Sequence, residues 1–414
     1  MSVLELALCA KSAAPILAQA DSNLKNKALF AIADAIERNV DNILRENAKD
    51  IQNAKASGIS ASLIDRLSLS EKRLRSIADS VREVAGLNDP IGEVLGGCVR
   101  PNGLAIRKIR VPIGVCGIIY EARPNVTVDA AVLCLKSGNV CLLRGGKEAI
   151  CSNSILVSVM QEALRSVGLP AAAVSFINDV SRESSNEMMK LNGILDVLIP
   201  RGGAGLINAV VNNSTVPVIQ TGVGNCHIYV DSSADIGMAV DIAVNAKCSR
   251  PSVCNAAETF LVHSSIASAF LFALKPRLDE YSVETHGCDI TKKILGDCVI
   301  PATEEDYEKE YLDYKVAIKV VDSLDEAIDH INKFGTRHSE CIVTSDVFSA
   351  ETFTKKIDAA AVYVNASTRF TDGGEFGLGA EIGISTQKLH ARGPMGLSEL
   401  TTYKYIVSGN GQIR

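Results

Sequence analysis

Cys254 is the residue of this 414-residue sequence whose surroundings best suit nucleophilic chemistry. Arg250 and Pro251 come just before it and interrupt the helical pattern of residues 239–246, and an apolar strand pattern follows at residues 258–262. Loops between regular elements are where proteins commonly place side chains that meet a substrate. We therefore predict that Cys254 is a catalytic nucleophile. The alternative is a small packing residue, which is the role of most cysteines.

The chemistry expected of this cysteine depends on the charge around it. A thiol attacks as the thiolate, so its usual pKa of ~8.5 must fall for reaction at neutral pH. Lys247 and Arg250 stand close to Cys254 in the sequence. We expect their positive charge to favour the thiolate.

Two glycine-rich turns are candidates for binding a phosphate group. Residues 201–205 read Arg-Gly-Gly-Ala-Gly after a strand pattern, and residues 222–224 read Gly-Val-Gly. A glycine-rich turn that opens a helix presents backbone N–H groups to an anion such as a pyrophosphate. Neither turn has the Gly-x-Gly-x-x-Gly spacing, and each is also compatible with a plain tight turn.

Composition favours a protein that acts on small molecules. The net charge is -6, and no Lys/Arg block is long enough to follow a phosphate backbone, which argues against a nucleic-acid partner. Hydrophobic residues make up 47% of the chain without an apolar run of membrane-spanning length, so we expect a globular protein that does not cross a membrane. The length predicts two or more domains.

Cysteine usage indicates a reducing compartment. The sequence has twelve cysteines but neither a Cys-x-x-Cys pair nor a Cys/His spacing typical of zinc. We therefore expect reduced thiols, a cytoplasmic location and no metal site. Residues 16–20 are small and mostly apolar, but Glu5 and Lys11 interrupt any signal-peptide core, so we predict an amphipathic helix there instead.

Periodicity along the chain predicts an α/β protein. Strand and helix patterns alternate from residue 111 onward, which is typical of βαβ units and parallel sheets. In the first half we predict helices at 29–51, 68–86, 126–137 and 150–166, a hairpin at 95–112, and strands at 111–119, 140–143, 174–177 and 195–199. In the second half we predict strands at 228–230, 259–262, 316–321, 341–343 and 361–364, and helices at 234–247, 265–278, 323–333 and 348–356. Residues 279–314 receive no assignment.

Several long motifs in a fixed order carry a resemblance that covers nearly the whole chain. They are Tyr120 to Asp129, Leu143 to Glu148, Ile199 to Gly205, Arg250 to Thr259, Tyr363 to Gly374 and Thr386 to Gly396. Together they resemble the aldehyde dehydrogenase superfamily, in its acyl-phosphate-reducing form. The resemblance implies an α/β, aldehyde dehydrogenase-like fold with two Rossmann-like parallel-sheet domains plus a small oligomerisation hairpin and tail.

The resemblance also implies a division of labour along the chain. Residues 1–96 and 112–224 are expected to form an NADPH-binding domain, residues 225–396 a catalytic domain, and residues 97–111 and 397–414 the oligomerisation elements. In the superfamily such a hairpin pairs with the C-terminal tail, so we expect a homo-oligomer. The alternative is a surface hairpin that folds onto its own domain.

The expected cofactor is NADPH/NADP. The resemblance favours the first glycine turn, with Gly202, Gly203 and Gly205, as the cofactor loop. Arg144 and Lys147 follow a strand where the superfamily places the cofactor ribose, and NAD-preferring members commonly have an acidic residue in place of Lys147. Basic residues there suit a 2′-phosphate; the alternative is two solvated surface charges. Glu310 is expected to hold the nicotinamide ribose.

One departure from oxidising relatives bears on the reaction. Gln220 stands where those relatives have the glutamate base that activates water, and an amide cannot take a proton from water. This favours a thioester that meets hydride. The relatives' oxyanion-binding asparagine aligns with Ala122, so we assign Asn125, three residues on, and the backbone N–H of Cys254 as oxyanion donors.

The resemblance implies an NADP-dependent phosphorylating glutamate-5-semialdehyde dehydrogenase that reduces L-glutamyl 5-phosphate to the semialdehyde through a cysteine thioester, the second step of proline biosynthesis from glutamate. Arginines suit the substrate's anionic groups. The predicted substrate-binding residues are Arg123, Arg250, Arg369 and Arg392. A transient contact with a glutamate 5-kinase is a further expectation. The alternatives are another aldehyde dehydrogenase-type enzyme that releases free acid, and a non-catalytic binding protein on this fold.

Overall fold

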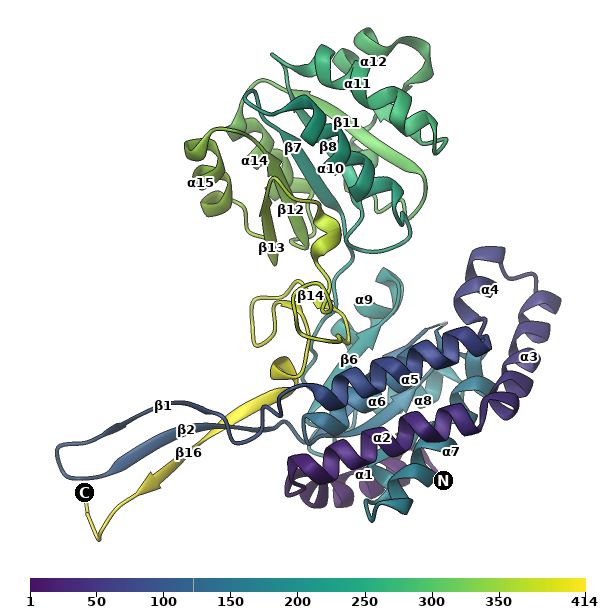
Figure 1. Cartoon of the computed structure of the whole chain (residues 1–414), viewed down its shortest axis with the longest axis vertical. Coiled ribbons are helices and arrows are strands. Elements are labelled where there is room, and N and C mark those ends of the chain that lie inside the picture. Colours follow the sequence, from purple (N-terminus) through teal and green to yellow (C-terminus); the bar gives the residue numbers. More distant parts are fainter. Residues whose placement is uncertain (122) are drawn as a thin grey trace. The chain divides into compact units, whose positions relative to one another are not determined.

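A computed structural model describes residues 1–121 and 123–414 of the chain, and for residues 61 and 62 it describes the backbone only. The chain divides into two compact units. Unit 1 comprises residues 1–221, 377–383 and 395–414, and unit 2 comprises residues 222–376 and 384–394. Each unit contains a parallel sheet with helices (Figure 1), so the predicted α/β fold class is confirmed.

The parallel sheet of unit 1 has the strand order β5-β4-β3-β6. Its strands are β3 (Val115–Tyr120), β4 (Val140–Arg144), β5 (Val174–Phe176) and β6 (Val197–Arg201). Every residue of β3 is buried, which explains its unbroken apolar run, because both faces of a parallel sheet are covered. The two loops predicted to meet the cofactor directly follow β4 and β6, at the carboxyl ends of these strands, where α/β sheets commonly bind ligands.

Helices surround this sheet. They are α1 (Val3–Ala18), α2 (Ser22–Arg38), α3 (Val40–Ala56), α4 (Ala61–Leu67), α5 (Glu71–Gly86), α6 (Pro124–Lys136), α7 (Ile150–Ser166), α8 (Arg182–Met189) and α9 (Ala204–Asn213). The expected N-terminal helix is present, and a capping box between Ser2 and Glu5 starts it. The single long helix predicted over 29–51 is wrong, because the chain breaks at Asn39, whose backbone leaves the helical region (φ -108°, ψ 17°).

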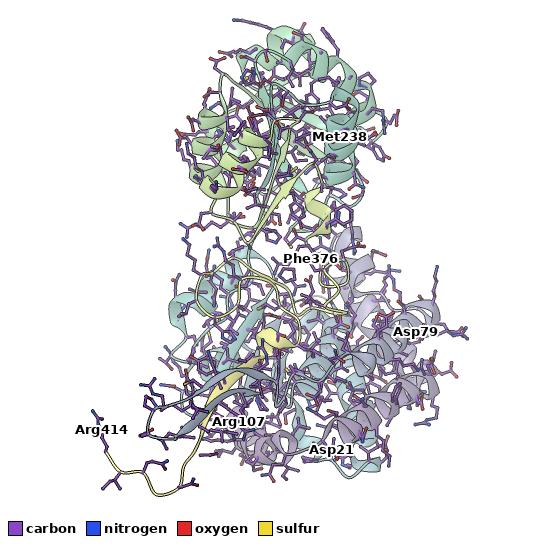
Figure 2. The ribbon with its side chains drawn as sticks, turned by 60° about the vertical axis from the view of Figure 1, so that its left-hand side comes forward. Asp21, Asp79, Arg107, Met238, Phe376 and Arg414 are labelled. Atoms are coloured by element: carbon purple, nitrogen blue, oxygen red, sulfur yellow. The ribbon has the colours of Figure 1, made fainter. Side chains whose placement is uncertain are left out.

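An antiparallel ribbon also belongs to unit 1. It contains β1 (Val94–Val99), β2 (Ala105–Pro112) and β16 (Thr401–Ser408), in the order β1-β2-β16. Figure 1 shows it extending away from the helices of the same unit, and Figure 2 shows Arg107 on it and Arg414 at the chain end beyond it. The predicted pairing of hairpin and tail is confirmed, with Thr401 opposite Pro112 and Ser408 opposite Ala105.

The parallel sheet of unit 2 has the order β10-β9-β11-β8-β7-β12-β13. Its strands are β7 (Cys226–Val230), β8 (Ala257–His263), β9 (Glu284–Gly287), β10 (Ile300–Pro301), β11 (Lys315–Val321), β12 (Ser339–Val343) and β13 (Ala361–Val364), and a small antiparallel pair, β14 (Ile384–Ser385) and β15 (Gly393–Pro394), accompanies it. The helices are α10 (Ile236–Cys248), α11 (Ala267–Asp279), α12 (Asp289–Leu295), α13 (Glu304–Glu308), α14 (Leu324–Phe334) and α15 (Val347–Lys356).

The stretch 279–314, which the sequence left unassigned, therefore has regular structure. It contributes the edge strand β10, its neighbour β9, and two short helices, α12 and α13, of seven and five residues. Elements this short give little periodicity in the sequence, which explains why no pattern stood out. Glu310 lies near the end of this segment, between α13 and β11.

Within the part of the chain that the structure describes, no helix is long and apolar enough to cross a membrane. Nor do those residues include a cluster of three or more His, Cys, Asp or Glu side chains that could hold a metal ion.

Candidate active site

Residues 249–255 carry the predicted nucleophile, Cys254, and are called the nucleophile loop below; they join the end of α10 to the start of β8 in unit 2. Cys254 is partly exposed in this loop, whereas Cys248, on the last turn of α10, is buried. Burial raises the pKa of the Cys248 thiol to about 11. Of the two cysteines in this stretch, Cys254 is therefore the one placed to react with a substrate.

The backbone of Cys254 is packed against a glycine. A Cβ atom on Gly224 would lie 1.4 Å from the carbonyl oxygen of Cys254, so only glycine fits there. The same carbonyl accepts a hydrogen bond from the buried thiol of Cys226, at 3.2 Å. The second glycine-rich turn thus supports the nucleophile loop, and the N–H of Gly224 is already bonded to Glu310 at 2.8 Å.

Arg369 lies beside the nucleophile loop. Its Nε donates to the hydroxyl of Ser249 at 3.1 Å, and its guanidinium also bonds the side-chain oxygen of Asn255. Asn255 in turn donates to the carbonyl of Thr371 at 3.0 Å and accepts at its own carbonyl from Thr368 at 2.7 Å. These bonds join the segment 368–371 to the nucleophile loop.

The electrostatics confirm that two predicted arginines are near each other. Burial, followed by the neighbouring positive charge of Arg250, lowers the pKa of Arg369. The thiolate of Cys254 acts on Arg369 in the opposite direction. Arg250 itself is exposed. Arg369 is therefore within charge range of both Arg250 and Cys254.

Arg392 has a different environment. It forms an ion pair with Asp358 at 2.7 Å, and Lys388 reaches the same carboxylate at 2.7 Å. These two cations lower the pKa of Asp358 to about 2. A substrate carboxylate or phosphate would have to compete with Asp358 for Arg392. The fourth predicted arginine, Arg123, is the N-cap residue of α6 in unit 1.

Lys247 departs from its expected role. Its side chain is fully buried, and its Nζ lies 2.5 Å from Oε2 of the equally buried Glu258. The expectation that Lys247 supplies open positive charge to Cys254 is therefore corrected, because a neighbouring carboxylate compensates that charge. Burial raises the pKa of Glu258 to about 7, although Lys247 opposes the rise.

Glu310 is half-buried in the same unit. Its Oε1 accepts the N–H of Gly224, and burial raises its pKa above the ordinary value, with the Gly224 bond and Lys247 opposing. The predicted cofactor residue is thus connected to the nucleophile loop through a single glycine. No signal in the sequence linked these two loops, since they are about sixty residues apart.

In unit 1, Asn125 lies in the first turn of α6 and is partly exposed. Its Nδ2 donates to Asp129 at 2.9 Å. Burial raises the pKa of Asp129 to about 6, against the effects of Asn125 and Arg201. Asn125 therefore has an amide oriented by a carboxylate one turn on. Ala122, with which the relatives' asparagine aligns, lies outside the described residues.

The first glycine-rich turn leads from β6 into α9, with Gly203 as the N-cap residue. The N–H of Gly203 donates to the carboxylate of Glu121 at 2.9 Å. A Cβ atom on Gly202 would lie 2.4 Å from the same carboxylate oxygen, so the absence of a side chain permits this approach. The carboxylate of Glu121 thus occupies the turn that the sequence predicts to bind a phosphate.

The two basic residues at the end of β4, Arg144 and Lys147, differ in burial and in hydrogen bonding. Arg144 is half-buried and donates to the carbonyls of Val180 and Ser181, at 2.8 and 2.9 Å, which fastens it to the loop before α8. Burial lowers its pKa. Lys147, in the short turn that precedes α7, is exposed to solvent. Of the two, Lys147 is the cation that a bound group can reach without breaking an existing contact.

Comparison with known proteins places this geometry in a family. The model of the aldehyde dehydrogenase family matches residues 3–294 and 316–406. The gamma-glutamyl phosphate reductase of Carboxydothermus hydrogenoformans is 61% identical over 412 residues, covering 100% of this chain and 99% of that protein. That of Clostridium perfringens (strain SM101 / Type A) is 61% identical over 405 residues, covering 98% and 97%.

The chain belongs to the aldehyde dehydrogenase family, in its gamma-glutamyl phosphate reductase branch. The crystal structure of the Thermotoga maritima gamma-glutamyl phosphate reductase is 51% identical, covers 100% of both chains and superposes with a TM-score of 0.98. An acetylating aldehyde dehydrogenase from Geobacillus thermoglucosidasius, at 19% identity and a TM-score of 0.72, shares the fold. The resemblance inferred from the motifs is confirmed.

Sequence reasoning missed three residues of this aldehyde dehydrogenase site. Glu121 and Glu258 were noticed only as letters within motifs, and Cys226 was counted with the packing cysteines. Their roles depend on contacts with residues distant in the chain, such as the 82 residues that separate Glu121 from Gly203. The sequence offered one signal for such a contact: Glu258 is a carboxylate in a largely apolar strand pattern, and a buried carboxylate needs a partner.

Proposed function

We propose that the gamma-glutamyl phosphate reductase activity of this chain, a step of proline biosynthesis, proceeds through a thioester on Cys254 with NADPH as the hydride donor. The observation that carries the proposal is the position of Cys254: a partly exposed thiol on a braced loop, beside Arg250 and Arg369. A thiolate that must attack a charged acyl phosphate benefits from nearby cations, both for its own pKa and for the substrate.

The covalent step follows from this arrangement. The thiolate of Cys254 attacks the acyl carbon of L-glutamyl 5-phosphate, the C–O bond to the phosphoryl group breaks, and phosphate leaves with the electron pair. Arginine suits such an anion because its planar guanidinium can donate two parallel bonds. Arg250 and Arg369 are the proposed ligands, while Arg123 and Arg392 stay predictions. Asn125 and the N–H of Cys254 are the proposed oxyanion donors.

The residues of unit 1 fit a nicotinamide dinucleotide. The N–H of Gly203 already bonds a carboxylate, which shows that it is oriented toward an anion, and a pyrophosphate oxygen is an anion of the same kind. Gly202, Gly203 and Gly205 are the proposed phosphate loop, and Glu310, which belongs to unit 2, remains the predicted ribose ligand. NADPH bound there would supply the hydride that reduces the thioester. After reduction, loss of the aldehyde returns the Cys254 thiolate.

The choice of NADPH over NADH rests on Lys147. Its exposed ammonium follows β4, where a dinucleotide-binding sheet meets the ribose. Arg144 is committed to the carbonyls of Val180 and Ser181, so its part is to shape the loop around Lys147. Glu148, next along the chain, is the local carboxylate that would favour a 2′-hydroxyl instead. Replacement of Lys147 distinguishes the two possibilities.

Gln220 disfavours the second enzymatic reading, an aldehyde dehydrogenase that releases free acid. Without a carboxylate base the thioester should be hydrolysed slowly. In the reverse reaction, glutamate semialdehyde and NADP should give product only with phosphate or arsenate, and arsenate should support continuous turnover because an acyl arsenate decomposes. Gln220→Glu should raise phosphate-independent oxidation by about 10²-fold or more. Full-rate glutamate formation by wild-type enzyme without phosphate would overturn the proposal.

We also propose that the antiparallel ribbon supports a homo-oligomer. The strand β16 forms one edge of the ribbon and β1 the other, and exposed edges invite pairing with another chain. The large apolar side chains exposed on the ribbon are Val94, Leu95, Val99, Tyr403, Tyr405 and Val407. Light scattering on the full chain and on a chain truncated before residue 401 tests this. The truncated chain should form an assembly with fewer subunits.

Two further expectations concern the cell. We propose a cytoplasmic location. We also propose a transient contact with a glutamate 5-kinase, because an acyl phosphate hydrolyses readily and direct transfer from one enzyme to the other would limit that loss. Co-sedimentation of the two purified enzymes tests the contact. If each protein sediments in the mixture as it does alone, the proposed contact with the kinase is wrong.

A further inference from the structure

The ion pair of Lys247 and Glu258 is buried in unit 2, where it joins the last turn of α10 to β8. Both side chains are fully buried, and Nζ of Lys247 lies 2.5 Å from Oε2 of Glu258. Burying two charges costs solvation free energy that their attraction often fails to recover, so such a pair is poorly explained by stability alone. A role in arranging the surrounding loops is a better physical account.

The second oxygen of Glu258 is bonded to the other loop. Its Oε1 accepts the backbone N–H of Leu312 at 3.2 Å. Leu312 has a positive φ of 56°, a left-handed conformation that a leucine seldom adopts without external contacts that hold it. The carboxylate is one such contact. The pair therefore helps determine the path of the chain two residues after Glu310.

From Glu310 the contacts return to the nucleophile. Oε1 of Glu310 accepts the N–H of Gly224 at 2.8 Å, and the Cα of Gly224 lies so close to Cys254 that a Cβ atom would overlap its carbonyl. Lys247 also acts on Glu310 through its charge. The ring formed by Lys247, Glu258, Leu312, Glu310, Gly224 and Cys254 thus joins the two loops inside one unit.

We propose that the buried Lys247–Glu258 pair is a positioning element that holds the Glu310 loop at a fixed place relative to the Cys254 loop. The proposal rests on the roles proposed above for Glu310 and Cys254. Neither member of the pair contacts a reacting atom. Its effect on the reaction comes through the position of Glu310, and an error of about 1 Å in such a position can cost on the order of 10²-fold in rate.

The test separates positioning from stability with two charge-free double variants. Lys247→Met with Glu258→Gln keeps an oxygen for the N–H of Leu312, whereas Lys247→Met with Glu258→Leu removes it. Both variants avoid the unpaired buried charge that a single substitution would leave. The matched control is Lys25→Met with Asp89→Leu, since the buried Lys25 and the mostly buried Asp89 form a pair of the same 2.5 Å length in unit 1.

The measurements are the thermal midpoint, kcat and KM for NADPH, and the rate at which iodoacetamide alkylates Cys254. We expect the Leu double variant to lose about tenfold to a hundredfold in kcat/KM for NADPH. The Gln double variant should recover most of that loss at a similar thermal midpoint. The Lys25/Asp89 control should change the midpoint but not the kinetic constants.

Three outcomes overturn the inference. Two of them are equal kinetics in the Gln and Leu variants, and kinetic losses that follow the thermal midpoint in the control as well. Glu310→Ala, measured beside them, separates this from the proposed function. If Glu310→Ala leaves KM for NADPH unchanged, the role proposed for Glu310 fails. If Glu310→Ala raises that KM while the Leu double variant does not, the positioning role of the pair fails.

Discussion

The nucleophile loop of unit 2 and the cofactor loops of unit 1 are built in opposite ways. Residues 249–255 are held by buried contacts: the Asn255 network, the thiol of Cys226 and the close fit of Gly224. The proposed cofactor residues instead have exchangeable surroundings, an exposed Lys147 and an N–H of Gly203 bonded to the exposed Glu121. The difference suits the chemistry proposed for them, because covalent attack needs a preorganised atom and a cofactor must enter and leave.

Gly224→Ala should break the rigid side of this comparison most severely. The new methyl group would overlap the backbone of Cys254, which cannot move away as a flexible side chain could. We expect kcat to fall by about 10²-fold or more, because the nucleophile is displaced. Gly86→Ala is the matched control, since a Cβ atom at the end of α5 meets nothing within 4 Å. Retained activity in Gly224→Ala would show that the nucleophile loop adapts.

Lys147→Glu tests the exchangeable side. Replacing a cation by an anion should raise KM for NADPH by about tenfold to a hundredfold, since one charge-assisted contact contributes roughly 1.5–3 kcal/mol. KM for NADH, which has no 2′-phosphate to repel, serves as the internal control and should change little. An unchanged preference would move the 2′-phosphate site elsewhere, with Arg144 the next residue to replace.

Glu121→Gln sharpens the comparison with a smaller effect of opposite sign. The carboxylate of Glu121 accepts the N–H of Gly203, and a pyrophosphate bound there, as proposed, would have to displace it. Removing its charge should tighten NADPH binding by about fivefold, the equivalent of roughly 1 kcal/mol. Glu183→Gln, in the first turn of α8, is a control that leaves the turn at Gly203 untouched. Weaker NADPH binding in Glu121→Gln would mean that Glu121 contributes to the bound state.

Much of the fold could be predicted because its signals are local. The buried run of β3 and the alternation of strands and helices are visible in hydrophobic periodicity. The break at Asn39 was not visible, since the apolar positions continue at helical spacing across it. The short elements of 279–314 lie below the length at which a period can be recognised.

The site divides in the same manner. The roles of Cys254 and the turn at Gly203 were predicted from motifs, because each motif has particular residues at adjacent positions, and these roles stay predictions. The burial of Lys247 against Glu258, and the bond from Arg392 to Asp358, depend on contacts that no spacing reveals. From the sequence, Lys247 was expected to add positive charge near Cys254. Its partner Glu258, eleven residues on, stands in a strand pattern, and nothing in the spacing indicated that the two side chains pair.

The most direct test of the account is whether Cys254 carries the acyl group. The enzyme is mixed with freshly generated L-glutamyl 5-phosphate in the absence of NADPH, quenched in acid and digested. The masses of the cysteine-containing peptides are then measured by mass spectrometry. Cys254→Ala and Cys248→Ala are treated in parallel and assayed for turnover. The account predicts a glutamyl adduct on Cys254 alone, no turnover in Cys254→Ala with NADPH binding retained, and an active Cys248→Ala. An adduct on another residue, or equal loss of turnover in both variants, would contradict it.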